Sequence, residues 1–118
     1  MSSRQVGSHY ETLAIKYLED NGLTITQRNY RCKLGEIDLI GEDREYLVFI
    51  EVKYRTTSNI GYSVEAVNYK KQRIISKCAS YYCMVNDIDQ MKSIRFDVVI
   101  FDGNEFEWIK NAFEYIEK

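Results

Sequence analysis

The sequence contains no proline, a single histidine, and three cysteines that show no C-x-x-C spacing: Cys32, Cys78 and Cys83. An odd number of cysteines without that spacing predicts neither a disulfide framework nor a zinc knuckle, so they are expected to be reduced packing residues. No proline-rich, low-complexity or repeated stretch marks a linker. A chain of 118 residues is therefore predicted to form one domain over residues 1–118.

Long apolar runs are absent as well, and the N-terminus does not resemble a signal peptide. We therefore expect a cytoplasmic protein with no membrane partner. The sequence also has no excess of positive charge: it contains 16 Lys and Arg and 18 Asp and Glu, which gives a net charge of -2. This balance argues against nonspecific binding of polyanions, although a cleft with basic walls focuses its own field whatever the total charge.

The order of periodic patterns predicts α-β-β-β-α-β-β. Apolar residues at helical spacing predict a helix over about residues 4–21: Tyr10, Leu13, Ala14, Tyr17 and Leu18. Strands are expected at 24–32, 36–41 and 46–54, with a turn at 42–45. A second helix over about 63–85 is followed by a strand at 93–101, a turn at 102–104, a short strand at 105–109 and a weak terminal helix.

This order predicts an α/β sandwich around a mixed central sheet, in which the strand after the second helix joins the sheet by a crossover. The runs LVFIEV and FDVVIF fit strands that are covered on both faces. Ionisable residues inside such strands are costly. Asp38, Glu51 and Lys53 are therefore the residues that need an explanation.

Alternate side chains of a strand share a face, which predicts Glu36 and Asp38 on one face and Ile37 and Leu39 on the other. In the following strand, one face carries Phe49, Glu51 and Lys53, and the other carries Val48, Ile50 and Val52.

A turn centred between Arg44 and Glu45 would place Asp38 opposite Glu51, so that the two carboxylates converge. A slip of one residue would put them on opposite faces. The register of this hairpin is thus part of the prediction.

Two adjacent carboxylates repel, and desolvating either costs several kcal/mol, roughly, unless a cation compensates. Lys53 is one such cation, and a divalent metal is a better one. Magnesium prefers carboxylate and carbonyl oxygens, and the backbone carbonyl of Val52 lies between Glu51 and Lys53. Such a set can hold Mg²⁺ (or Mn²⁺), activate a water and offset charge on a phosphate. The alternative is an ordinary ion pair on a strand.

The segments NYRCKLGEIDLI and VFIEVKYR, with Gly7 and Glu11 before them and RFDVVIF after them, resemble the YraN family of uncharacterised bacterial proteins. The resemblance covers most of the chain, from about Gly7 to Phe101. More broadly, a helix glutamate, an Asp, a Glu-x-Lys and a basic helix in succession are similar to the PD-(D/E)XK restriction-endonuclease-like superfamily, which includes archaeal Holliday-junction resolvases. Ile37 replaces the proline of that superfamily's name.

The resemblance implies a restriction-endonuclease-like fold with Asp38 and Glu51 as metal ligands and Lys53 as the residue that orients or activates the attacking water. It also implies Glu11 as an additional ligand or water-holding residue. Ser8 to Glu11 matches a helix capping box, however, so a capping role for Glu11 is the alternative.

Five basic residues are expected to contact nucleic-acid phosphates, with a solvated surface as the alternative: Arg55, Lys70, Lys71, Arg73 and Lys77. Glu36 is expected to pair with Arg31, Lys33 or Arg55 at the sheet edge in preference to supporting Asp38. Asp97 is expected to pair with Arg95 or with a helix lysine.

Three functions follow from these expectations. The first is a magnesium-dependent DNA endonuclease whose substrates include branched DNA or recombination intermediates. The second is a nucleic-acid-binding or partner-binding module that keeps the nuclease fold without cutting. The third is a domain whose ion pairs form no site. Phosphate contacts do not distinguish DNA from RNA. Cutting two strands requires two sites, which makes a homodimer one option for the assembly.

Overall fold

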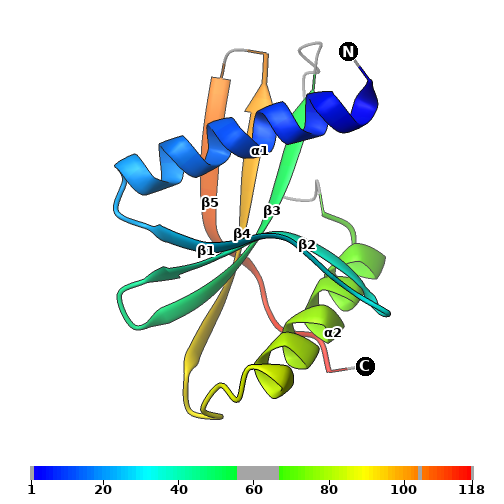
Figure 1. Cartoon of the computed structure of the whole chain (residues 1–118), viewed down its shortest axis with the longest axis vertical. Coiled ribbons are helices and arrows are strands. Elements are labelled where there is room, and N and C mark those ends of the chain that lie inside the picture. The colour runs from blue at the N-terminus through cyan, green and yellow to red at the C-terminus, as the bar shows by residue number, and fades with distance from the viewer. Residues whose placement is uncertain (1, 56–66, 104, 118) are drawn as a thin grey trace.

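The computed structural model describes residues 2–55, 67–103 and 105–117. Its elements are α1 (Ser3–Asp20), β1 (Thr24–Cys32), β2 (Gly35–Asp43), β3 (Tyr46–Arg55), α2 (Tyr69–Val85), β4 (Ser93–Asp102) and β5 (Glu105–Phe113). The strands form one sheet in the order β1-β2-β3-β4-β5, in which only β3 and β4 are parallel (Figure 1). The predicted α/β class, element order and mixed sheet are confirmed, and they are consistent with a restriction-endonuclease-like sandwich.

Two apolar clusters cover the opposite faces of this sheet. Ala14 and Leu18 of α1 pack with Val48, Ile50 and Val99 on one face. On the other face, buried residues of α2 pack against the sheet: Ile75, Cys78 and Ala79 with Leu47, Phe49, Phe96 and Val98. Because successive residues of β3 alternate between the clusters, the sheet is covered on both sides, as the continuous apolar runs predict. Among the described residues, no helix has the length and apolar character needed to cross a membrane.

Helix α1 begins earlier than a capping box at Ser8 would require. Ser2 is its N-cap: the Ser2 N–H donates to Gln5 Oε1 at 2.8 Å, and the Gln5 N–H donates to Ser2 Oγ at 3.2 Å. Glu11 therefore lies in the middle of the helix, and its interpretation as a cap is wrong. The other interpretation of Glu11, as an additional ligand or water-holding residue of the site, stays a prediction.

The hairpin of β2 and β3 has the predicted register. Asp43 pairs with Tyr46, and the pairing continues to Leu39 and Ile50, which leaves Arg44 and Glu45 as a two-residue turn. Arg44 adopts the left-handed region, with φ of 58°, as two-residue hairpin turns commonly require. The next position along this register places Asp38 beside Glu51.

The largest differences from the predicted boundaries lie at the start of α2 and at the C-terminus. Residues 63–66 lie outside the described part of the chain, but residues 67 and 68 are not helical, because Asn68 is the N-cap of α2 and its side chain accepts the Lys71 N–H at 2.9 Å. The predicted terminal helix is wrong: β5 continues to Phe113, and residues 114–117 are irregular.

The C-terminal segment lacks a helix because side chains of α2 and β4 hold it in an extended path. Phe113 stacks on Phe96 with ring centroids 5.0 Å apart. The Ile116 N–H donates to Ser76 Oγ at 3.0 Å. These contacts replace the local hydrogen bonds that a terminal helix would form.

Strand β4 contains a buried ion pair that the sequence predicts. The Arg95 side chain donates two hydrogen bonds of 2.9 Å to Asp97, and Trp108 Nε1 and the Asn111 N–H each donate one more at 2.9 Å. Arg95 also lies 3.0 Å from Asp43. Asp97 is thus fully satisfied by its neighbours and has a structural role.

Replacing Gly41 with alanine is expected to destabilise the fold by about 1–3 kcal/mol, because overpacking a strand interior forces neighbours to shift. A Cβ at Gly41 would lie 2.6 Å from the backbone carbonyl oxygen of Thr24 and 2.7 Å from Leu23 Cδ2. Gly7→Ala is the matched control, because a Cβ there meets only Tyr54 Oη at 3.9 Å and alanine favours the helix. Urea unfolding of both variants measures the difference, and equal stability would refute the close approach at Gly41.

Candidate active site

Asp38 and Glu51 lie side by side where β2 and β3 separate. The backbone N–H of Val52 donates to Asp38 Oδ2 at 2.8 Å, which holds the Asp38 carboxyl group across the end of the hairpin. The Glu51 side chain is only 5% exposed, and the Asp38 carboxyl group lies close enough to raise its pKa. The structure thus brings the two acidic residues together, as the hairpin register requires.

The regular pleat of β2 is interrupted at Asp38. Ile37 packs in the cluster beneath α2, whereas Leu39 packs in the cluster beneath α1, so the prediction that they share a face is wrong. On the neighbouring strand, Asn29 adopts a φ of 55° between the paired positions Arg28 and Tyr30. This irregularity explains why the side chains of β2 do not alternate regularly between the two faces of the sheet at Asp38. The Asp38 side chain contacts β3 at this point.

Two lysines contact the buried carboxylate from different elements. Lys53 Nζ, on β3, lies 3.6 Å from Glu51 Oε2, and Lys71 Nζ, on α2, lies 3.3 Å from the same oxygen. The sequence predicts Lys71 only as a phosphate-contacting residue of the helix surface. Recognising Asn68 as the N-cap would have placed Lys71 in the first turn of α2, but only the packing of α2 shows that this turn faces Glu51.

The ionisation of Glu51 reflects this environment. The pKa of Glu51 is raised to about 7: burial is the largest cause and the neighbouring Asp38 adds to it, whereas the ammonium groups of Lys71 and Lys53 lower it. Burial lowers the pKa of Lys71, but its contact with Glu51 outweighs this effect, so that the pKa of Lys71 is raised overall. The two acids are therefore short of positive charge, even with both lysines in contact.

The donor set fits a magnesium-type ion. The N–H and C=O of one strand residue point to the same side, so the Val52 carbonyl faces the side on which its N–H meets Asp38. Over residues 2–55, 67–103 and 105–117, no three His, Cys, Asp or Glu residues gather closely enough to hold a metal by themselves. Magnesium is commonly held by one or two carboxylates and retained waters, so Asp38, Glu51 and the Val52 carbonyl suffice chemically.

Glu11 lies next to Asp38, on the side of the carboxylate pair that faces α1 and β1. Its side chain is 14% exposed, and Arg28 Nε lies 3.4 Å from Glu11 Oε1. Burial is the largest cause that raises the pKa of Glu11, and Asp38 raises it further, while Arg28 and Asn29 lower it. Arg28 also donates to the Ser8 carbonyl at 2.8 Å, and its role is not predictable from the sequence because no spacing pattern links β1 to α1.

The other predicted phosphate contacts have different settings. Lys70 and Lys77 are exposed on α2, and Arg73 is half-buried. Arg55 is the last residue of β3, and its side chain lies outside the described part of the structure. At the sheet edge, Arg31 Nε lies 3.3 Å from Glu36 Oε2. The preferred interpretation of Glu36 as an edge ion pair is confirmed.

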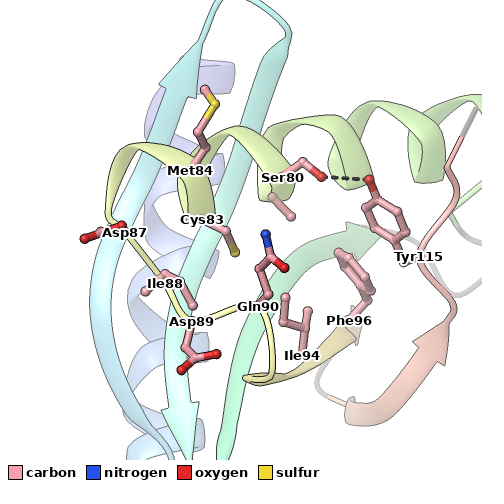
Figure 2. A pocket seen from close by; sticks show the side chains of 11 residues that line it. Ser80, Cys83, Met84, Asp87, Ile88, Asp89, Gln90, Ile94, Phe96 and Tyr115 are labelled. Atoms are coloured by element: carbon pink, nitrogen blue, oxygen red, sulfur yellow. Dashed lines mark hydrogen bonds between the residues drawn. The ribbon is translucent and has the colours of Figure 1, made fainter.

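A cavity of about 730 Å³ lies away from these acids, at the C-terminal half of α2 (Figure 2). Cys83, Met84, Ile94 and Phe96 line it, and Ser80 Oγ and Tyr115 Oη form a 2.7 Å hydrogen bond at its edge. Its charged lining residues are Asp87 and Asp89, and no lysine or arginine lines it among the described residues. An acidic, apolar cavity does not suit a phosphodiester, so the site at Asp38 and Glu51 is the better candidate.

The protein is a five-stranded α/β sandwich. It carries a carboxylate pair and two lysines at the end of the β2–β3 hairpin. The chain belongs to the uncharacterised protein family UPF0102, whose model matches residues 10–101. It is 46% identical over 114 residues to a UPF0102 protein of Lachnoclostridium phytofermentans, which covers 97% of both chains. A relative from Legionella pneumophila is 43% identical over 114 residues and covers 95% of this chain and 97% of its own.

Replacing Glu51 with glutamine is expected to stabilise the metal-free fold at high pH. The folded-state pKa, about 7, lies above the ordinary value of 4.5, so the folded protein retains a proton that the unfolded chain releases. The stability contributed by this proton is full below the ordinary pKa and is lost as the pH rises through 7. Glutamine resembles the protonated side chain, so the variant should gain up to about 3 kcal/mol near pH 8.5 and almost nothing near pH 4.5.

Urea unfolding in EDTA at both pH values measures this gain. Glu36→Gln is the matched control, because the exposed Glu36 pair should contribute less than about 1 kcal/mol at either pH. A Glu51→Gln variant that is less stable than the wild type near pH 8.5 would show that the lysines overcompensate the buried charge.

Proposed function

We propose that this protein is a divalent-metal-dependent endonuclease of the PD-(D/E)XK restriction-endonuclease-like superfamily. It hydrolyses phosphodiester bonds of DNA, including branched or recombination intermediates. The observation that carries the proposal is the contact of Asp38 with Glu51, together with Lys53 at 3.6 Å from the Glu51 carboxylate. Two acids and a lysine on adjacent strands supply the charges that phosphodiester hydrolysis needs.

Each residue of this site has a distinct part in the proposal. Asp38, Glu51 and the Val52 carbonyl would hold Mg²⁺ or Mn²⁺, which when bound supplies a Lewis acid and a more acidic water. Lys53, with a side chain that is 36% exposed, reaches both Glu51 and solvent, so its ammonium group orients the attacking water and offsets charge on the phosphate. Glu11, held by Arg28, retains a water beside Asp38.

Contacts with the rest of the nucleic acid are assigned to the basic residues around this site. Lys70 and Lys77 present ammonium groups on the exposed surface of α2, Arg73 is half-buried on the same helix, and Arg55 is the last residue of β3. Such contacts bind phosphates without reading sequence. A cytoplasmic location and a homodimer that supplies two sites stay predictions.

A second candidate function is a module that binds nucleic acid without cutting it. The favouring observation is that Lys53 and Lys71 both contact Glu51 Oε2, at 3.6 and 3.3 Å. Two internal ammonium groups already compensate this carboxylate in part. In that case the basic surface would bind DNA, and the acids would serve stability alone.

A cleavage panel distinguishes these functions. The wild type is incubated with Mg²⁺ or Mn²⁺ and single-stranded, duplex, flap and four-way-junction DNA, beside Asp38→Asn, Glu51→Gln and the control Glu36→Gln. The proposal expects cleavage by the wild type and the control, and none by the two site variants or in EDTA. Cleavage that persists in both site variants would contradict the assigned site. Binding of DNA without cleavage by any protein would favour the binding module.

A further inference from the structure

Cys32 and Cys78 form a close pair of thiols on two different elements. Cys32 is the last residue of β1, Cys78 lies in α2, and their sulfur atoms are 3.7 Å apart although the residues are 46 positions apart in the chain. Both are free thiols, as is the third cysteine, Cys83. The pair is unused by the proposed hydrolytic chemistry.

A glycine allows the two elements to approach at this point. Gly35 pairs with Cys32 across the tight turn between β1 and β2. A Cβ at Gly35 would lie 2.5 Å from Ile74 Cγ2 and 3.3 Å from Cys78 Sγ. Helix α2 therefore packs directly on the backbone of the β1–β2 hairpin, which brings the two thiols together.

The same face of α2 connects the thiol pair to the candidate active site. Lys71, Ile74 and Cys78 are spaced i, i+3 and i+7, so they lie along one side of the helix. Lys71 contacts Glu51, and Cys78 contacts the end of β1. A covalent bond at Cys78 would therefore fix the helix face that carries Lys71 against the hairpin that carries Asp38.

The two thiols differ in accessibility. Cys78 has 0% exposure, and burial raises the pKa of its thiol to about 12, whereas Cys32 is half-buried. The thiolate is the reactive form, so Cys32 is the thiol that an external reagent reaches first. A disulfide bond is about 2.05 Å long, and the sulfurs must approach by roughly 1.7 Å to form it, a shift that side-chain rotation at the end of a strand can supply.

We propose that Cys32 and Cys78 are a redox modification site that forms a disulfide in the presence of a small-molecule disulfide such as oxidised glutathione. The Cys32 thiolate attacks one sulfur of the reagent, forming a mixed disulfide and releasing one reduced glutathione. The Cys78 sulfur, on losing its proton, then attacks the Cys32 sulfur and releases the second glutathione. Two cysteine thiols are oxidised, and one glutathione disulfide is reduced to two thiols.

The crosslink has a measurable consequence that does not depend on the proposed nuclease activity. It closes a loop between β1 and α2, which restricts the unfolded chain and is expected to raise Tm by roughly 5 °C or more. It also ties α2 to the β1–β2 hairpin at a distance of two helical turns from Lys71. The oxidised protein should therefore resist unfolding until a reductant is added.

The test treats the full-length protein with a series of oxidised and reduced glutathione ratios, followed by acid quenching, intact-mass analysis and peptide mapping. The expected result is a monomer about 2 Da lighter, with a Cys32–Cys78 peptide link that dithiothreitol removes. Cys83→Ser should behave in the same way, and its Tm should rise equally on oxidation. Cys32→Ser and Cys78→Ala should show neither the mass loss nor the rise in Tm.

Three results would overturn the proposal. One is a protein that carries only glutathione adducts on single cysteines. Another is a disulfide that involves Cys83, within one chain or between two chains. The third is a Cys32–Cys78 link that forms only after denaturation. Loss of DNA cleavage in the cleavage panel would leave the proposal intact, because the mass and Tm measurements need no substrate.

Discussion

Replacing Lys53 with methionine is expected to slow metal-dependent DNA cleavage by at least about 100-fold, the usual loss when one preorganised charge-stabilising group is removed. Methionine preserves most of the apolar stem of lysine and removes only the ammonium group. That group lies 3.6 Å from Glu51 Oε2 on a half-exposed side chain, so it can reach a water or a phosphate oxygen as well. Single-turnover rates on the best substrate of the panel measure the effect.

The matched control is Lys16→Met, which makes the same change of charge at a side chain that is 77% exposed and pairs with Asp20 on α1. Its cleavage rate should stay within about two-fold of the wild type, since exposed ion pairs contribute little. Calorimetric titration of Mn²⁺ into Lys53→Met separates the causes: Mn²⁺ should bind at least as tightly as in the wild type, because a nearby positive charge is removed. A Lys53→Met variant that cleaves at the wild-type rate would refute the role assigned to Lys53.

Replacing Asp97 with alanine is expected to destabilise the fold by about 3–5 kcal/mol, the usual cost of removing one partner of a buried ion pair. Asp97 has 0% exposure and accepts hydrogen bonds from Arg95, Trp108 Nε1 and the Asn111 N–H. The variant would leave three donors, on Arg95, Trp108 and Asn111, without this acceptor. Only Arg95 retains a second carboxylate, that of Asp43 at 3.0 Å.

Urea denaturation with a common m-value measures this loss. Asp20→Ala is the control, because the Asp20 side chain is 66% exposed and its pair with Lys16 should contribute less than about 1 kcal/mol. DNA cleavage by folded Asp97→Ala at low temperature should remain, since Asp97 belongs to a network apart from Asp38 and Glu51. A loss below about 1 kcal/mol would show that the network is weakly coupled to folding.

The hairpin register was predictable from the sequence because short-range patterns determine it. Leu39 and Ile50 face the same core, and a turn centred between Arg44 and Glu45 pairs them. Once that register holds, Asp38 must lie next to Glu51. The element order and the crossover of β4 into the sheet follow similarly from the periodic patterns and the apolar runs, whereas the parallel pairing of β4 with β3 is known from the structure.

The remaining features depend on packing between distant segments. Nothing in the local pattern shows that Lys71 faces Glu51, because every lysine on a helix surface has the same signature. The break at Asp38, which moves Ile37 to the other face from Leu39, arises opposite the left-handed residue Asn29. The extended C-terminal segment is likewise held by Ser76 and Phe96, which are distant in sequence.

Calorimetric titration of Mn²⁺ into the wild type, Asp38→Asn and Glu51→Gln tests the metal site most directly. Glu36→Gln is the control, because it removes a nearby exposed charge without touching the carboxylate pair. We expect one Mn²⁺ to bind the wild type and the control, and affinity to fall at least about ten-fold in both site variants, since each loses an anionic ligand. Equal affinity in all four proteins, or no binding by the wild type, would contradict a metal site at Asp38 and Glu51.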